Sequence, residues 1–131
     1  MKHIKLLTTD FLEIEYNLVD EILVCNWTGM ITKEAIMNGY ETISFFLKKE
    51  FCHKLLDNHM GVRGIWSEQS GWMAHDWHPR AEAAGLRYHA CVYSADTFSR
   101  LSTDQAIRMV KNGIVKGFDS PDAAEGWLKT W

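Results

Sequence analysis

Two kinds of hydrophobic spacing alternate along this chain, and their alternation restricts the fold more than any single motif does. Residues 11–16 and 21–27 show strand patterns on either side of a turn at residues 17–20, which predicts an antiparallel hairpin. A helix-like stripe follows, with apolar residues four, three, four and four positions apart: Ile36, Tyr40, Ile43, Leu47 and Phe51. This stripe predicts a helix over residues 33–50, capped by Thr32.

The same alternation continues to the end of the chain. Short strands are predicted at residues 53–57, 86–93 and 114–118. Between them we expect a helix from Ser67 to Gly85 that Pro79 kinks or restarts, and a helical region after residues 94–96 in which Ser102 and Gln105 form a capping box. A last helix begins at Ser120, which is followed by a proline and an acid. The order ββαβαβαβα predicts an α/β fold with a mixed, mostly parallel sheet.

Length and charge limit the functions open to the chain. Its 131 residues fit one domain, 1–131, with residues 1–10 as an N-terminal lead-in. The net charge is −3, and lysines and arginines do not cluster, so nucleic-acid binding is not expected. No stretch approaches the ~20 apolar residues of a membrane span, so we expect no membrane span.

The chain's beginning and its cysteines predict a cytoplasmic protein. The first residues resemble a signal peptide, but the chain turns polar at residues 8–10 before an apolar run forms. Cys25, Cys52 and Cys91 are odd in number and lie far apart, without the framework of a secreted disulfide protein. Cys25 and Cys91 are expected in the core, and Cys52 is the cysteine expected to be most reachable.

The stretch from His53 to Gly85 is where we expect a ligand or a partner to bind. Its predicted strand ends at Asp57–Asn58, a glycine-containing loop follows over residues 59–64, and a tryptophan-rich helix begins near Ser67. The carboxyl end of a strand that opens onto a helix N-terminus is a common binding position in α/β proteins. The candidate ligand- or partner-binding residues are Asp57, Asn58, His59, Arg63, Trp66, Ser67, Trp72 and Met73.

Each of these candidates has a simpler structural explanation. Asp57 and Asn58 can end a strand and cap a loop, with His59 in solvent. Arg63 can meet an anion at the helix start. The tryptophans can pack against the sheet or the Pro79 kink, or one of them can be exposed and mark a pocket or a partner surface.

Metal binding and catalysis have weaker support in the sequence. His75 and His78 are three residues apart and could bind zinc together with His53 or His59, although no cysteine joins them at ligand spacing. Asp57, His59 and His75 could also form an acid–base set. The chain contains no nucleophile elbow, phosphate loop or dinucleotide fingerprint, so we expect no cofactor and no catalytic residue.

Several local patterns together resemble one protein family. They are the hairpin, the long helix, the Leu-Leu-Asp-Asn strand end, the Trp-x-x-x-x-Trp-x-Pro-Arg-Ala helix, the Gly-Leu-Arg-Tyr strand and the Ser-Pro-Asp-Ala-Ala-x-x-Trp-Leu helix. From about Phe11 onwards the chain resembles the small SpoIIAA-like proteins of the STAS/SEC14-like group, which are related in fold to bacterial anti-sigma-factor antagonists. The resemblance implies a SpoIIAA-like fold.

The resemblance also implies two functions. Anti-sigma-factor antagonists carry a phosphorylatable serine directly after an aspartate at the start of a helix, whereas here Asn58 follows Asp57. A non-catalytic regulatory or interaction module without that phosphoswitch is therefore the first hypothesis. The SEC14-like branch implies a carrier of a lipid or a small apolar ligand, in a pocket lined by Trp66, Trp72, Met73, Phe45 and Phe46. An exposed aromatic patch would make a homodimer plausible.

Overall fold

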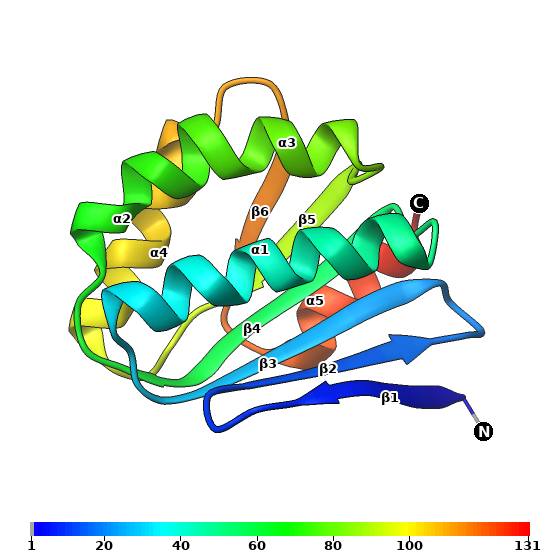
Figure 1. Cartoon of the computed structure of the whole chain (residues 1–131), viewed down its shortest axis with the longest axis horizontal. Helices are drawn as coiled ribbons and strands as arrows, with labels where there is room; N and C mark the ends of the chain where they lie inside the picture. The colour runs from blue at the N-terminus through cyan, green and yellow to red at the C-terminus, as the bar shows by residue number, and fades with distance from the viewer. Residues whose placement is uncertain (1) are drawn as a thin grey trace.

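A six-stranded mixed sheet with helices on both faces forms the structure (Figure 1), a computed structural model that describes residues 2–131. The strands are β1 (His3–Thr8), β2 (Leu12–Asn17), β3 (Ile22–Met30), β4 (Lys54–Arg63), β5 (Tyr88–Val92) and β6 (Ile114–Phe118). The helical segments are α1 (Lys33–Lys49), α2 (Ser67–Trp72), the π-helical turn η1 (Met73–Trp77), α3 (His78–Ala83), α4 (Thr97–Met109) and α5 (Pro121–Lys129). The predicted α/β class and the interleaved order of strands and helices are confirmed.

The strands follow one another across the sheet in chain order. β2 is antiparallel to both of its neighbours, β1 and β3, whereas β3, β4, β5 and β6 are parallel to one another. Because parallel crossovers are right-handed, three crossovers that advance in one direction lie on the same face of the sheet. The helices from α1 to α4 therefore share one face, and α5 alone covers the other, as Figure 1 shows with α1 in front of the strands and α5 behind them.

Two apolar cores result from this arrangement. The larger core lies under α1 and η1 and contains Trp27, Trp66 and Trp77, all at most 1% exposed. The smaller core lies under α5, where Ala124 and Leu128 pack on the opposite face of the sheet. Two predicted caps are present: the Thr32 and Ser120 side chains each accept a hydrogen bond from the amide three residues later.

Four sequence predictions about the elements were wrong. Residues 3–8 of the predicted lead-in form the edge strand β1, and β4 continues through the predicted glycine loop to Arg63. The helical region expected after residues 94–96 begins at Thr97, but Ser102 lies inside α4 and does not cap it, because its hydroxyl donates to the Phe98 carbonyl. Phe51 is 86% exposed, because α1 ends at Lys49 and the chain reverses with Phe51 at φ 52°.

The helix between β4 and β5 is continuous but irregular. The irregularity expected near Pro79 is present: the helix widens into the π-turn η1 and resumes as α3 at His78, with Pro79 in the first turn of α3. The wider turn carries Trp77 inwards, so that its indole N–H donates to the Tyr40 carbonyl at 2.6 Å. Among residues 2–131, no helix combines the length and the apolar character needed to cross a membrane.

Gly39 allows α1 to approach the sheet closely. A Cβ atom at this position would collide with the six-membered ring of Trp27, whereas a Cβ atom at Gly126 in α5 would meet nothing. Alanine normally stabilises a helix relative to glycine by about 1 kcal/mol. We expect Gly39→Ala to destabilise the protein by about 1–3 kcal/mol through overpacking. Urea unfolding measures the difference, with Gly126→Ala as the matched control, which should be neutral or stabilising.

Candidate functional site

A buried carboxylate, Asp57, lies at the centre of the larger core. The inward-facing residues of β4 alternate as Leu55, Asp57 and His59, and all three are fully buried. The indole N–H of Trp27 donates to Oδ1 of Asp57 at 2.7 Å, and the hydroxyl of Tyr40 donates to Oδ2 at 2.7 Å. Strand β3 and helix α1 thus each supply one hydrogen bond to the same carboxylate.

Two histidines complete the environment of this carboxylate. Nε2 of His59 lies 3.1 Å from Oδ1 and also 3.1 Å from the Tyr40 hydroxyl. Nε2 of His89, on β5, lies 2.9 Å from Oδ2. Because Asp57 only accepts hydrogen bonds, both histidines donate through Nε2. Their Nδ1 atoms are buried and have no partner among the described residues.

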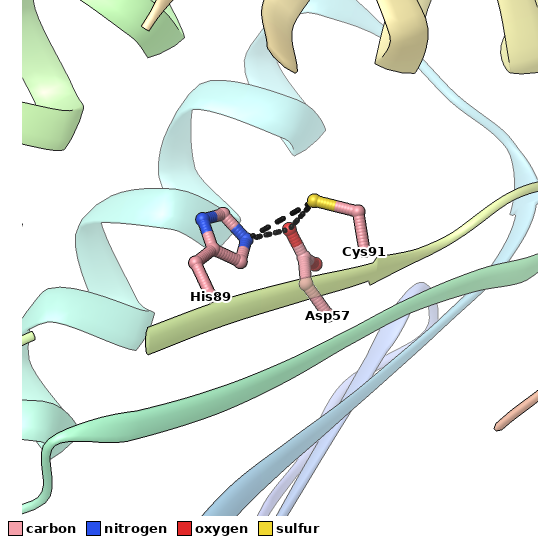
Figure 2. A group of neighbouring side chains, drawn as sticks. All are labelled: Asp57, His89 and Cys91. Carbon is pink, nitrogen blue, oxygen red and sulfur yellow. Dashed lines mark hydrogen bonds and ion pairs between the residues drawn. The ribbon is translucent and has the colours of Figure 1, made fainter. Parts of the chain in front are cut away.

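Cys91 lies next to Asp57 and His89. In the register of the sheet, Cys91 on β5 is opposite Asp57 on β4. Its Sγ atom lies 3.3 Å from Nε2 of His89 and 4.0 Å from Oδ2 of Asp57. Figure 2 shows the Asp57, His89 and Cys91 side chains pointing toward one another above the two strands.

The surroundings determine the charge states. Burial by itself would raise the pKa of Asp57, but the adjacent His59 and His89 outweigh it and hold that pKa well below its usual range. Burial, reinforced by the Asp57 charge, raises the pKa of the Tyr40 hydroxyl and of the Cys91 thiol. The site therefore contains one ionised carboxylate that accepts hydrogen bonds from N–H and O–H groups.

This geometry does not match a Cys–His–Asp catalytic relay. In such a relay the carboxylate binds one imidazole nitrogen and the nucleophile binds the other. Here Nε2 of His89 faces both Asp57 and Cys91, and Nδ1 faces neither. All three side chains are fully buried, so no substrate reaches them in this conformation.

The structure divides the predicted site residues between the interior and the surface. Asp57, His59, Trp66 and Met73 lie in the core. The expectation that Asp57 ends a strand and that His59 is in solvent was wrong, because β4 carries both side chains inwards. Asn58 faces the other side of β4, half-buried, and its amide donates to Oδ1 of Asn26 at 2.9 Å.

The remaining candidates lie apart from this buried group. Arg63 is exposed at the end of β4, and Trp72 is half-buried at the rim of the core. The Ser67 hydroxyl lies 3.1 Å from that of Ser102. His75 is exposed, whereas His78 is buried. The ring of His78 stacks on that of His89, with 5.4 Å between the ring centroids. In the described chain, His75 and His78 do not belong to a group of three potential metal ligands.

Sequence reasoning missed four members of the buried group: Trp27, Tyr40, His89 and Cys91. A usable signal existed in β5, where His89 and Cys91 alternate with the apolar Ala90 and Val92 of the opposite face. The cysteine predictions also need one correction. Cys52 is 1% exposed, and its thiol donates to the Lys54 carbonyl, so it is not reachable.

A second feature is an exposed apolar surface at the carboxyl edge of the parallel strands. We define the edge patch as Met30, Ile65, Phe98 and Leu101, which are each 57–64% exposed. Met30 and Phe98 face a shallow hollow that is also lined by Arg63, Gly64, Ala95 and Asp96. The patch therefore joins the ends of β3 and β4 to the start of α4.

The edge patch is held on a rigid frame. The Gly64 amide donates to Oδ2 of Asp96 at 2.6 Å, and the Ser99 hydroxyl donates to the Gly64 carbonyl. The Ser94 hydroxyl donates to the Val62 carbonyl at 2.5 Å, and the Ile31 amide donates to the Arg63 carbonyl at 2.9 Å. Arg63 forms no ion pair with any residue in the described part of the chain.

Comparison of the chain with protein-family models, with curated proteins and with solved structures found no match.

The Tyr40 hydroxyl provides a test of the buried network. Tyr40→Phe removes one donor to a buried ionised carboxylate and should cost about 1.5–3 kcal/mol of unfolding free energy. The control is Tyr88→Phe, because Tyr88 is half-buried and its hydroxyl has no hydrogen-bond partner in the described residues. Urea unfolding should show a change within about 0.5 kcal/mol for this control. Equal effects of the two variants would contradict the role given to Tyr40.

His78 should make the protein sensitive to mild acid. Burial and the neighbouring His89 lower the pKa of His78 to about 4, although Glu82 opposes the shift. Because the unfolded state binds a proton near pH 6.5, stability is complete above that pH and is lost as the pH falls towards 4. We expect a loss of about 2 kcal/mol by pH 5.

The control variant for this prediction is His78→Gln, which can still donate to Glu82 but does not titrate. Urea unfolding midpoints measured from pH 7.5 down to 5 should fall less in the variant than in the wild type. Parallel pH profiles of the two proteins would show that His78 is not the titrating group.

Proposed function

We propose that this protein is a non-catalytic interaction module of the SpoIIAA/STAS-like type, which binds an acidic, apolar segment of a partner protein at the edge patch. The observation that carries the proposal is the exposure of Met30 and Phe98 beside Arg63 in one hollow at the carboxyl edge of the sheet, with Ile65 and Leu101 also exposed on neighbouring segments. Exposed large apolar side chains that gather in one region are typical of a binding site in a soluble protein.

The charge of the hollow indicates the chemistry of the partner. Arg63 lies among the apolar side chains without a counter-ion from the described residues. The other charged residue of the hollow, Asp96, uses Oδ2 to accept the Gly64 amide and so is directed towards the backbone. An incoming carboxylate would pair with Arg63, while apolar side chains of the same segment would cover Met30 and Phe98.

The family resemblance is consistent with this assignment. An antiparallel hairpin followed by parallel βαβ units is the fold that the SpoIIAA-like resemblance implies, and it supports a SpoIIAA-like domain. A phosphoswitch at Asn58 has no support. Asn58 lies within β4, and its side chain bonds to Asn26 and to the Met60 amide.

The carrier alternative has less support than the interaction module. A lipid would need space between the tryptophan-rich helix and the sheet. In the described residues that space is filled by Trp66, Met73 and Trp77, each at most 1% exposed. Phe45 points outwards at 60% exposure. An enzyme that uses His75 and His78 has no third metal-binding group beside them in residues 2–131.

A binding experiment with matched variants tests the proposal. Immobilised wild-type protein captures partners from lysate of the source cell, and the candidate is then purified and titrated by calorimetry. We expect Phe98→Asp and Arg63→Glu each to raise the dissociation constant at least about tenfold, which corresponds to a loss of about 1.4 kcal/mol of binding free energy. The effect of Arg63→Glu on the dissociation constant should decrease as salt is added, because the interaction of Arg63 with the partner is electrostatic.

The controls are Phe51→Asp and Lys48→Glu, which alter an exposed phenylalanine and an exposed lysine near the opposite edge. Both should bind like the wild type. A partner that binds all four variants equally would refute the edge patch as its site. Sedimentation of the wild type provides a further test. A homodimer that Phe98→Asp dissociates would identify a second copy of the chain as the occupant, in place of a different protein.

A further inference from the structure

We propose that Asp57, His89 and Cys91 form a binding site for one Zn²⁺ ion inside the sheet–helix core. The three ligand atoms are Oδ2 of Asp57, Nε2 of His89 and Sγ of Cys91, and all lie within 4.8 Å of one another. Together they are an oxygen, a nitrogen and a sulfur donor, a set that suits zinc. The site is independent of the edge patch and of its partner.

The distances fit an ion without movement of the backbone. The separations are 2.9 Å between Oδ2 and Nε2, 3.3 Å between Sγ and Nε2, and 4.0 Å between Sγ and Oδ2. A point in the plane of the three atoms lies about 2.0 Å from each. Small side-chain rotations that lengthen the Oδ2–Nε2 and Sγ–Nε2 separations would raise the ion out of that plane into the tetrahedral geometry that zinc prefers, at ligand distances of about 2.0–2.3 Å. The side chains come from adjacent strands in fixed register, so the triangle is part of the sheet.

Neighbouring groups support the ligands in the way that outer partners of metal ligands do. Trp27 holds Oδ1 of Asp57, and Tyr40 donates to Oδ2, which leaves a lone pair of Oδ2 for an ion. When Nε2 of His89 binds metal, the imidazole proton moves to Nδ1, which has no acceptor among residues 2–131, so the outer support comes from the partners of Asp57.

The charge balance favours a divalent ion. Zinc replaces the thiol proton of Cys91, which leaves the site as a proton, and the imidazole keeps a single proton on Nδ1. The ion's two positive charges are then balanced by one thiolate and one carboxylate, so the buried site becomes neutral. Because one thiol proton is released, zinc affinity should rise about tenfold per pH unit below the thiol pKa.

The experiment uses the full chain without an affinity tag, because histidine tags bind zinc themselves. The site is fully buried, so the protein is unfolded in urea and refolded with Zn²⁺ or Co²⁺, then passed over a chelating resin. We expect elemental analysis to find close to one ion per chain. The Co²⁺ form should show the near-ultraviolet charge-transfer band of a thiolate–cobalt bond, and Zn²⁺ should raise the unfolding temperature.

Two substitutions remove ligands and one serves as the control. Cys91→Ser and His89→Gln should abolish metal retention and, for Cys91→Ser, the thiolate band. Cys52→Ser replaces another buried cysteine outside the group and should behave like the wild type. Circular dichroism of each metal-free variant confirms folding before metal is added. If one of the two ligand variants does not fold, Asp57→Asn is tested in its place.

Three outcomes would overturn the proposal. The refolded wild type could retain almost no ion, which would leave the group as a hydrogen-bond network only. Cys91→Ser could retain as much metal as the wild type. Bound cobalt could lack the thiolate band, which would place the ion elsewhere in the chain.

Discussion

The ionised carboxylate of Asp57 imposes the strongest constraint on this structure. A buried charge costs several kcal/mol unless surrounding groups compensate for it. The compensating donors are Trp27, Tyr40, His59 and His89, which come from β3, α1, β4 and β5. Their shared acceptor fixes how far α1 lies along the sheet. The absence of a side chain at Gly39 lets the helix come close enough for Tyr40 to reach the carboxylate.

The middle of β4 and its carboxyl end serve different purposes. Its inward residues near the middle belong to the buried network, and its last residue, Arg63, stands at the exposed edge patch. Serine hydroxyls and the Asp96 carboxylate tie the intervening loops to the strand ends. A surface held in this way loses little conformational entropy when a partner binds, so more of its contact energy appears as affinity.

The sequence was sufficient to predict the α/β class, the hairpin, the long helix and the last strand and helix, because their apolar periodicity is undisturbed. It failed where polar residues point inwards. Asp57 and His59 interrupt the apolar run of β4, and Gly61 and Gly64 follow, so the strand was interpreted as a loop. The buried network could not be predicted, since its members come from segments far apart in the chain and meet only through sheet register.

The agreement between chain order and sheet order has a consequence for how the molecule assembles. Each strand pairs with the strand that precedes it, so the sheet can grow by adding consecutive units. Among residues 2–131, the groups that hydrogen-bond to the Asp57 carboxylate all lie between Trp27 and Cys91. On a ribosome the hydrogen bonds to Asp57 can therefore form while β6 and α5 are still being synthesised, and those last two elements then extend the sheet and cover its opposite face.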